Sequence, residues 1–215
     1  MIKLIGDIRP HQITGVALSG GVDSMALLSF LRNKRPKAVT AYFYDHGTKA
    51  SRIARQFVTD YCHKEGIDLN IGILDAEKPK RDSWEEFWRD QRYDWLFEQA
   101  CILNERFIAT AHHLNDVAET YVWGMAHGNP RFIHYRKPGY FDSPIIRPLL
   151  LTPKSELEAW CKRHSVPYIQ DESNSNVSFT RNRIRHNIVP EMLQVNPGFL
   201  KSVEKAWRNF FNYEE

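Results

Sequence analysis

Short runs of apolar, β-branched and aromatic residues alternate with longer segments of helical periodicity in this chain. The short runs span residues 14–18, 38–44, 68–74, 107–111 and 145–150. The segments with apolar residues at helical spacing span residues 25–33, 49–65, 83–104 and 116–127. Strands that alternate with helices in this way are typical of parallel βαβ units. The pattern therefore predicts an α/β fold, with an open, mostly parallel five-stranded sheet and helices on both faces.

The C-terminal part of the chain differs in character from the rest. Helical patterns cover residues 154–165 and about 197–211, and a polar segment at 170–187, rich in Asn, Ser and Arg, separates them. We expect one α/β domain over residues 1–190 and a helical extension over residues 191–215.

An apolar stripe runs along one face of the helix predicted over residues 83–104. Its members are Trp84, Phe87, Trp88, Trp95 and Leu96. A stripe at this spacing is typical of core packing, and we favour that interpretation over a platform on which nucleobases stack.

Composition limits the class of protein without identifying it. The chain has 215 residues and a formal net charge of +3, which permits a nucleic-acid partner without requiring one. No apolar run approaches the ~18 residues needed to span a membrane, and Asp7 comes too early for a secretory signal. We therefore expect a cytoplasmic protein with no membrane span. Cys62, Cys101 and Cys161 form no CxxC pair, and so indicate neither a zinc site nor a redox pair.

Polar segments follow three of the predicted strands directly, at residues 19–24, 45–47 and 112–113. In open parallel sheets, ligands bind beyond the carboxyl ends of the strands, where the strand order reverses. These three segments are therefore the candidate functional region.

The first of these segments has the composition of a phosphate-binding loop. Its members are Ser19, Gly20, Gly21, Val22, Asp23 and Ser24. Adjacent glycines let backbone N–H groups close around phosphate oxygens, and the following helix N-terminus adds partial positive charge. Asp23 can hold Mg²⁺ against the phosphates. The loop is not of the Walker type, because no GxxxxGK[ST] is present. A glycine pair alone is equally typical of an ordinary turn before a helix.

In its strand–loop–helix context, the segment 19–24 resembles the signature loop of the N-type ATP pyrophosphatases, or PP-loop enzymes. These enzymes adenylate an oxygen atom and release pyrophosphate. The resemblance implies an adenine-nucleotide alpha-hydrolase-like fold, ATP as cosubstrate and Mg²⁺ as cofactor.

Further segments resemble, in order, the motifs of the tRNA(Ile)-lysidine synthetases. They are DHG-x-x-x-S at 45–51, E-x-x-x-R-x-x-R-Y at 85–93, AHH-x-x-D-x-x-ET at 111–120, RPLL at 147–150, D-x-S/T-N at 171–174 and RNRIR at 181–185. The matches extend over about residues 14 to 200. The resemblance implies a short form that lacks the C-terminal tRNA-binding domains of many relatives.

An acidic pair in the third motif suits a cationic ligand. Asp116 and Glu119 are three residues apart, so their carboxylates share one face of a helix. Glu119 alone is as well explained as a solvated helix charge, but a pair beside an ATP site suits a primary amine. By the resemblance, both residues bind free L-lysine. Asp116 is also the candidate acceptor for the proton that the lysine amine loses.

Two histidine segments are candidates for nucleotide contact. His112 and His113 follow the fourth predicted strand, and adjacent histidines at a strand end are poorly placed to bind one metal ion. They line a nucleotide pocket or pack as polar core residues, and His46 contacts adenosine or caps a turn. The resemblance implies that His46 and His112 bind ATP.

Arginines supply the candidate contacts to anionic groups. Arg89 and Arg92 are three residues apart on one predicted helix, where one can bind a phosphate or carboxylate while the other pairs with a neighbouring glutamate. The resemblance implies that Arg89 is catalytic, with Asp23 and Asp116. The cluster near residue 185 is either a solvated basic turn or a contact to an RNA backbone. By the resemblance, the tRNA-binding residues are Arg147, Asn174, Arg181, Asn182, Arg183 and Arg185.

The resemblance implies lysidine formation on the wobble cytidine of an isoleucine tRNA with a CAU anticodon. ATP would adenylate the cytosine C2 oxygen with release of pyrophosphate, and the ε-amine of lysine would then displace AMP. A homodimer is compatible with the family. Two alternatives stay open: another PP-loop enzyme with a different RNA or small-molecule acceptor, or a catalytically silent nucleotide- or RNA-binding module. Thiolation would need cysteines near the loop, and the sequence indicates none there.

The chain departs from the family pattern at three places. Asn115 stands where a second acid is usual, and His127 stands where an arginine is usual. The glycine-rich loop expected after Gly128 is replaced by the segment 129–140. The last two changes bear on how a substrate enters the site.

Overall fold

A computed structural model describes most of the chain. The described residues are 1–6, 12–34, 39–75, 83–104, 106–137, 144–170 and 180–213. The strands are β1 (Gly15–Leu18), β2 (Thr40–Asp45), β3 (Leu69–Ile73), β4 (Ile108–Ala109) and β5 (Ile145–Ile146). The helices are α1 (Val22–Lys34), α2 (Lys49–Glu65), α3 (Trp84–Ile102), α4 (Leu114–Ala126), α5 (Lys154–Arg163), α6 (Thr180–Arg183), the π-helix η3 (Ile184–Ile188), α7 (Val189–Val195) and α8 (Phe199–Phe210).

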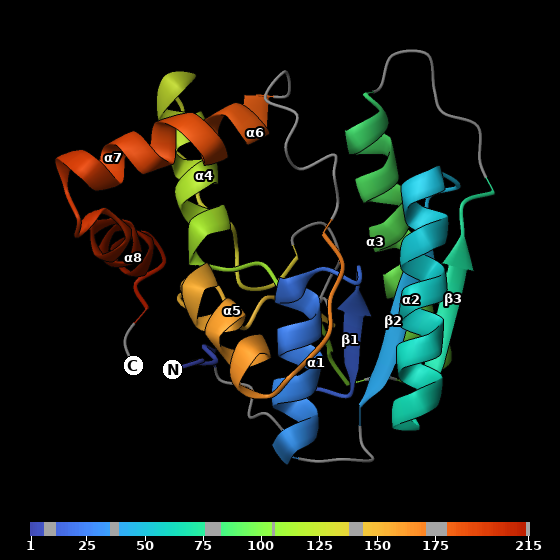
Figure 1. Cartoon of the computed structure of the whole chain (residues 1–215). Coiled ribbons are helices and arrows are strands. Elements are labelled where there is room, and N and C mark those ends of the chain that lie inside the picture. The colour runs from blue at the N-terminus through green and yellow to red at the C-terminus, as the bar shows by residue number, and fades with distance from the viewer. Residues whose placement is uncertain are drawn as a thin grey trace.

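The five strands form one open sheet in the order β3-β2-β1-β4-β5, and every strand pair is parallel. This confirms the predicted fold class (Figure 1). The order reverses between β1 and β4, because the chain adds β2 and β3 on one side of β1 before it adds β4 and β5 on the other. The loops after β1 and β4 therefore flank the crevice in which such sheets bind ligands.

Alternate side chains of the strands enter separate cores on the two faces of the sheet. Val16, Ala41 and Phe43 pack in a buried cluster with residues of α1, α2 and α5. Tyr42, which lies between Ala41 and Phe43 in the sequence, packs with Ile108 in a second cluster that includes residues of α3. Helices thus cover both faces, and the strands are apolar on both sides, as is typical of parallel sheets (Figure 1).

β4 and β5 are shorter than the sequence predicts. The fifth strand was expected to extend over residues 145–150. Only Ile145 and Ile146 pair with β4 in the sheet, and residues 148–151 form turns. Pro148 has no N–H group to donate to a neighbouring strand. The N–H of Arg147 turns to the carbonyl of Tyr135 (2.8 Å). The strand ends there, and the chain crosses the crevice toward α5.

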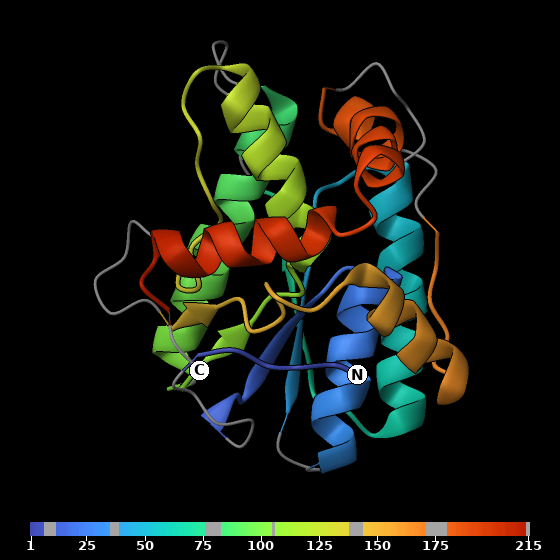
Figure 2. The ribbon, with the colours of Figure 1, turned by 90° about the vertical axis from the view of Figure 1, so that its left-hand side faces the viewer.

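A third core lies beside the sheet and joins α4 to the C-terminal helices. Its most buried members include Val117, Ile184, Val203 and Trp207. Figure 2 shows α8 crossing α4, and the Trp207 indole donates to the Ile133 carbonyl (2.8 Å). This core extends across residue 190, so the division into domains at that position stays a prediction without structural support.

The helices over residues 180–195 are absent from the sequence prediction. Their inner face is partly charged, because Arg181 and Arg185 point toward acidic residues of α4. A helix with arginines on its inner side lacks the apolar stripe by which amphipathic helices are recognised.

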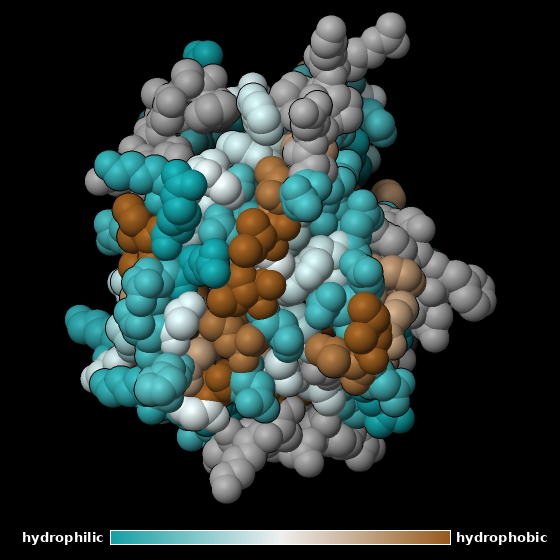
Figure 3. All heavy atoms as spheres, turned by 90° about the vertical axis from the view of Figure 1, so that its right-hand side faces the viewer, coloured by the Kyte–Doolittle hydropathy of each residue, from teal (hydrophilic) through white to brown (hydrophobic). Residues whose placement is uncertain are grey.

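β3 is the edge strand of the sheet, and Ile73 at its end is 55% exposed. Figure 3 faces the side of the molecule that carries this edge, where apolar side chains lie in patches between polar ones. Among the described residues, no helix is both long and apolar enough to cross a membrane.

Gly72 of β3 allows α3 to approach the sheet closely. A Cβ atom at this position would lie 2.5 Å from the Trp95 ring and 2.7 Å from the Tyr44 ring. We expect Gly72→Ala to lower the free energy of unfolding by about 1–3 kcal/mol, because the ring must move in a packed core. Urea denaturation measures this change. In the double variant with Trp95→Leu, the loss should be smaller than the sum of the single losses. Additive losses would show that the Trp95 ring does not limit residue 72.

Candidate active site

The candidate residues after β1 and β4 meet across the crevice where the strand order reverses. Asp23 lies in the first turn of α1, and His113 caps the start of α4. The Asp23 Oδ2 and His113 Nε2 atoms are 3.4 Å apart. The strands thus bring together two segments about ninety residues apart in the sequence.

Hydrogen bonds within the loop fix its shape. The Ser19 N–H donates to Ser24 Oγ (3.1 Å), and the Ser24 hydroxyl donates to the Gly21 carbonyl (3.1 Å). Gly20 has a φ of +81°, and a Cβ there would lie 3.2 Å from Ile169. The Ile169 N–H donates to the Gly20 carbonyl (3.0 Å), so the segment after α5 braces the loop. Glycine is therefore required at residue 20 for both conformation and space.

Asp23 has the properties expected of a magnesium ligand in this position. Its Oδ2 atom faces His113, whereas its Oδ1 atom is buried without a hydrogen-bond partner among the described residues. A buried carboxylate oxygen without a partner is costly unless a cation satisfies it. Mg²⁺ is commonly held by one or two carboxylates together with substrate phosphates. Asp23 therefore fits the predicted metal contact.

His113 links Asp23 to Asp116, a role that sequence reasoning did not assign. The backbone N–H of His113 donates to Asp116 Oδ2 (3.0 Å). The backbone N–H of Asp116 donates in turn to His113 Nδ1 (3.4 Å), which completes a capping box. With Nδ1 as acceptor, Nε2 carries the proton toward Asp23. Burial opposes charge on the imidazole, but Asp116 and Asp23 together raise the pKa of His113 above its ordinary value. The three-residue spacing to Asp116 is the sequence signal for this cap.

His112 points to a different environment from its neighbour. Its Nδ1 is 2.9 Å from the Thr110 hydroxyl. Burial, followed by the positive charge of Arg147, lowers the pKa of His112 to about 3. The imidazole is therefore neutral at physiological pH and can offer one donor or one acceptor to a nucleotide. This environment is compatible with the predicted ATP contact.

The predicted lysine-binding acids are both buried on α4, with exposures of 8% for Asp116 and 3% for Glu119. Arg181 Nη2 donates to Asp116 Oδ1 (3.0 Å), and its Nε donates to Glu119 Oε2 (3.0 Å). Arg185 Nε donates to Glu119 Oε1 (2.7 Å), and its Nη2 to Glu119 Oε2 (3.0 Å). Burial works against ionisation of Asp116, but His113 and Arg181 hold its pKa well below its usual range. The residues predicted to bind lysine therefore contact two of the residues predicted to bind tRNA.

The other predicted tRNA contacts have different surroundings. Arg183 is exposed on α6, and Asn182 is half-buried beside it. Arg147 is buried, and it donates to the His134 carbonyl (2.9 Å) and the Tyr93 hydroxyl (3.1 Å). Arg147 thus connects the end of β5 with Tyr93 of α3 and with His134, which precedes β5, and its contact with tRNA stays a prediction. Asn174 lies outside the described residues.

Arg92 lies near His46 and His112, the two predicted nucleotide contacts, whereas the catalytic role of Arg89 stays a prediction. Arg89 is exposed and pairs with Glu86 (3.4 Å) and Asp90 (3.3 Å) on its own helix. Arg92 is half-buried and has no carboxylate partner among the described residues. Burial lowers the pKa of Arg92, and neighbouring arginines, among them Arg147, add to this effect. Three residues along α3 therefore separate an exposed, paired arginine from a half-buried one.

The DHG-x-x-x-S motif places His46 beyond the end of β2. Asp45 Oδ1 accepts from the Gly47 N–H (2.8 Å) and from the Ser51 hydroxyl (2.5 Å), which fixes the turn into α2. Burial raises the Asp45 pKa, but these bonds and the charge of Arg55 hold it below its ordinary value. Burial, and then the charge of Arg92, lower the pKa of His46 to about 4. His46 is therefore a neutral group beside a cation.

The apolar stripe of α3 is only partly core. Phe87 and Leu96 are buried as predicted, but Trp84 is 53% exposed. Trp88 is half-buried, with its ring centroid 5.6 Å from that of His46. The N-terminal turns of α3 therefore extend the site outward, which the periodicity alone did not indicate.

Comparison with known proteins agrees with this geometry. The family described as "PP-loop domain" matches residues 1–192. The chain belongs to the PP-loop family.

Curated relatives of this PP-loop protein carry one common name. It is 39% identical over 209 residues to "tRNA(Ile)-lysidine synthase" of Thermotoga maritima, and the match covers 91% of this chain and 50% of that protein. It is 35% identical over 205 residues to the protein of the same name from Lactiplantibacillus plantarum, covering 91% and 45%. The PP-loop chain thus spans about half the length of the curated relatives it matches.

Solved structures support the fold alone. The "U34-tRNA thiolase NcsA from Methanococcus maripaludis with its [4Fe-4S] cluster" aligns with a TM-score of 0.77 at 17% identity, covering 97% of this chain and 76% of that chain. The "NH3-dependent NAD synthetase from Campylobacter jejuni" aligns with a TM-score of 0.51 at 13% identity, covering 95% and 88%.

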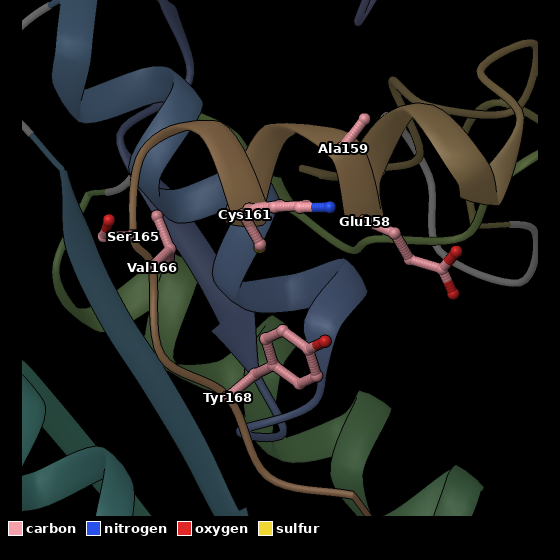
Figure 4. Close-up of a pocket in the computed structure, with 7 residues that line it drawn as sticks. Glu158, Ala159, Cys161, Ser165, Val166 and Tyr168 are labelled. Atoms are coloured by element: carbon pink, nitrogen blue, oxygen red, sulfur yellow. The ribbon is translucent and has the colours of Figure 1, made fainter.

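A surface cavity of about 510 Å³ lies away from these residues, along α5 of the PP-loop protein. Figure 4 shows Cys161, Val166 and Tyr168 around it, from α5 and the segment that follows. Cys161 is buried, and its thiol donates to the Val22 carbonyl (3.6 Å). Burial raises the pKa of this thiol to about 11. A cysteine therefore lies near the phosphate loop in space, contrary to the sequence prediction, but as a protonated structural group.

The neutral histidines make the stability of the PP-loop protein depend on pH. The folded pKa values of His112 (about 3) and His46 (about 4) lie below the unfolded value of 6.5. Between pH 6.5 and 4 the unfolded chain therefore binds more protons, and the free energy of unfolding falls as the pH is lowered. The raised pKa of His113 changes the free energy of unfolding only above pH 6.5. The lowered pKa of Asp116 changes it only near the acidic limit of this pH range.

Denaturation in urea at several pH values between 6.5 and 4.5 measures this dependence. His112→Asn should reduce the slope, which for one such group approaches ~1.4 kcal/mol per pH unit. His63→Asn, on α2 and exposed, is the matched control and should leave it unchanged. An identical slope for His112→Asn and the parent would show that His112 takes up its proton in the folded state.

Proposed function

We propose that the chain catalyses ATP-dependent lysidine formation on the wobble cytidine of an isoleucine tRNA with a CAU anticodon. The observation that carries the proposal is the connection from Asp23 of the phosphate loop, through His113, to the acids of α4. This connection supports the proposal because it would put a nucleotide held by the loop next to an amine held by the acids of α4. Relatives with the name "tRNA(Ile)-lysidine synthase" over this same half of their length support the choice of substrates.

In the first step, the loop would hold the phosphates of ATP while the cytosine C2 oxygen attacks the α-phosphorus and pyrophosphate leaves. Backbone N–H groups of the loop and the N-terminus of α1 supply positive charge toward the leaving group. Mg²⁺, when bound, would neutralise the phosphate oxygens, and Asp23 Oδ1 is the atom available to hold it. Arg92, which has no carboxylate partner among the described residues, adds a guanidinium near His46 and His112.

In the second step, the ε-amine of lysine would attack C2 and AMP would leave. Adenylation makes the C2 oxygen a better leaving group, which is why the reaction is divided in two. Asp116 and Glu119 would bind ammonium groups of lysine, in place of contacts that Arg181 and Arg185 make in this structure. The low pKa of Asp116 favours this binding role over the predicted role as proton acceptor, because a weak base removes a proton poorly.

Sulfur transfer is the alternative that the structural likeness raises. The chain offers little for it: Cys62 and Cys161 are buried with pKa values raised to about 11, and Cys101 lies exposed near the end of α3. Within the described ranges, no three His, Cys, Asp or Glu side chains are grouped to hold a metal ion. Another RNA or small-molecule acceptor remains the second candidate, and a homodimer stays a prediction.

Asp23→Ala should abolish AMP formation from ATP, because the phosphate site loses the carboxylate that faces its metal. The assay follows AMP with the tRNA, with and without lysine. The parent should form AMP only when both substrates are present. Asp60→Ala, on the exposed side of α2, is the control and should retain the parent rate. AMP formation that needs neither lysine nor this tRNA would overturn the proposed function in favour of another acceptor.

Glu119→Gln should raise the KM for lysine roughly tenfold or more, because a hydrogen bond to a charged group is lost. Glu119 also anchors Arg185, so the variant can lose stability for a purely structural reason. In the single variant the Arg185 guanidinium loses its partner. The double variant with Arg185→Gln removes this guanidinium, so its stability should return to the parental value while its KM for lysine stays raised. If both variants kept the parental KM for lysine, Glu119 would not bind lysine.

A further inference from the structure

Four aromatic side chains form a continuous ladder from the sheet to the surface. Tyr44 at the end of β2 lies 5.2 Å from His46, His46 lies 5.6 Å from Trp88, and Trp88 lies 5.5 Å from Trp84, measured between ring centroids. The His46–Trp88 and Trp88–Trp84 planes are tilted by only 35° and 38°. The ladder thus begins beside the predicted ATP contact and ends in solvent, where Trp84 is 53% exposed.

Two polar atoms inside the ladder lack partners. His46 Nδ1 and Trp88 Nε1 are buried, and neither has a hydrogen-bond partner among the residues that the structure describes. A buried indole N–H or imidazole nitrogen without a partner is unfavourable, and in native proteins such atoms commonly face a ligand or an ordered water. Both belong to adjacent rings, so one ligand edge can satisfy both. Core packing alone gives no reason for this pair.

The charges around the ladder favour an anionic polymer. Arg92 lies close enough to lower the His46 pKa, and no described carboxylate pairs with it. Arg89 compensates the negative charge of two acids in the first turns of α3, because it pairs with Glu86 and Asp90. Glu85, the remaining acid, lies near Arg181 and contributes to raising that residue's pKa.

We propose that the outer rungs, Trp84 and Trp88, form a stacking platform for an unpaired nucleobase next to the acceptor cytidine in the RNA. The Trp88 N–H would donate to an acceptor atom of that nucleotide, and Arg92 would face the adjoining phosphate. This inference rests on the proposed function, which brings a single-stranded loop to this side of the crevice. Unstacked bases of RNA loops are commonly bound on aromatic rings, and the stacking is tolerant of sequence.

The extent of the ladder argues for RNA over ATP. The predicted contact of ATP is His46, which lies at the inner part of the ladder. Trp84 lies two rungs further out and is open to solvent. An RNA strand that enters from solvent, with its acceptor base directed to the phosphate loop, would pass Trp84, Trp88 and His46 in that order.

The test uses an RNA stem-loop with a CAU loop as probe and measures its binding by fluorescence anisotropy without ATP. Trp84→Ala should weaken binding about fivefold or more, the usual effect of losing one base–aromatic stack. Trp88→Phe keeps a ring but removes the N–H, and should weaken binding about two- to tenfold. Ile102→Ala, on the same helix and 66% exposed, is the matched control and should bind like the parent.

ATP affinity, measured separately on each variant, should equal that of the parent. Variants that lose ATP affinity while keeping RNA affinity would assign the ladder to adenine and overturn the inference. Parental RNA affinity in both tryptophan variants would also overturn it, and would leave the proposed function intact if the parent still forms AMP with lysine and tRNA. A parent that does not bind the stem-loop would refute the proposed function itself.

Discussion

Two carboxylates buried side by side on α4 constrain the rest of the site. Removing a charged group from water is costly unless opposite charges and hydrogen bonds replace the solvent. Asp116 and Glu119 obtain these from Arg181 and Arg185, and Asp116 also from the backbone of His113. The requirement ties the C-terminal helices to α4 and explains why the core beside the sheet continues through η3 to α8. Without the acids, these helices would have no polar reason to pack there.

The same contacts connect stability to chemistry. A group that satisfies a buried acid in one state of the protein must be replaced, not merely removed, when a substrate binds. An ammonium group can do so because it carries the same charge as a guanidinium, although it lacks the planar fork. Arg181 is 45% exposed and Arg185 is 27% exposed at their side chains, so Arg181 is the easier of the two to displace. Arg185, which donates two hydrogen bonds to Glu119, is the harder of the two to displace.

How far the sequence predicts this structure depends on how local each feature is. The phosphate loop, the turn at Asp45 and the shared face of Asp116 and Glu119 are set within a few residues, and they were predictable. The ion pairs between α4 and Arg181 join positions 62 and 65 residues apart, which no periodicity reveals. Whether Arg89 or Arg92 is the more exposed depends on how α3 is rotated against the sheet.

The aromatic stripe of α3 shows the same limit. Its spacing correctly indicated one helical face, but not where along the helix that face leaves the core. Phe87 and Leu96 contact the interior, while Trp84 lies beyond the sheet and is exposed. Periodicity gives the direction of a side chain, and only the length of the neighbouring layer decides whether anything covers it.

Like charges around Arg92 have an energetic consequence. Burial lowers the pKa of Arg92, and the charges of Arg89, Arg147 and Arg181 add to this effect; burial also lowers the pKa of His112 most, with further contributions from Arg147 and Arg181. Mutual repulsion among fixed cations raises the free energy of the folded protein, and a polyanion that settles among them relieves it. Any anionic group that binds beside Arg92 would therefore gain free energy from the repulsion already present among these arginines.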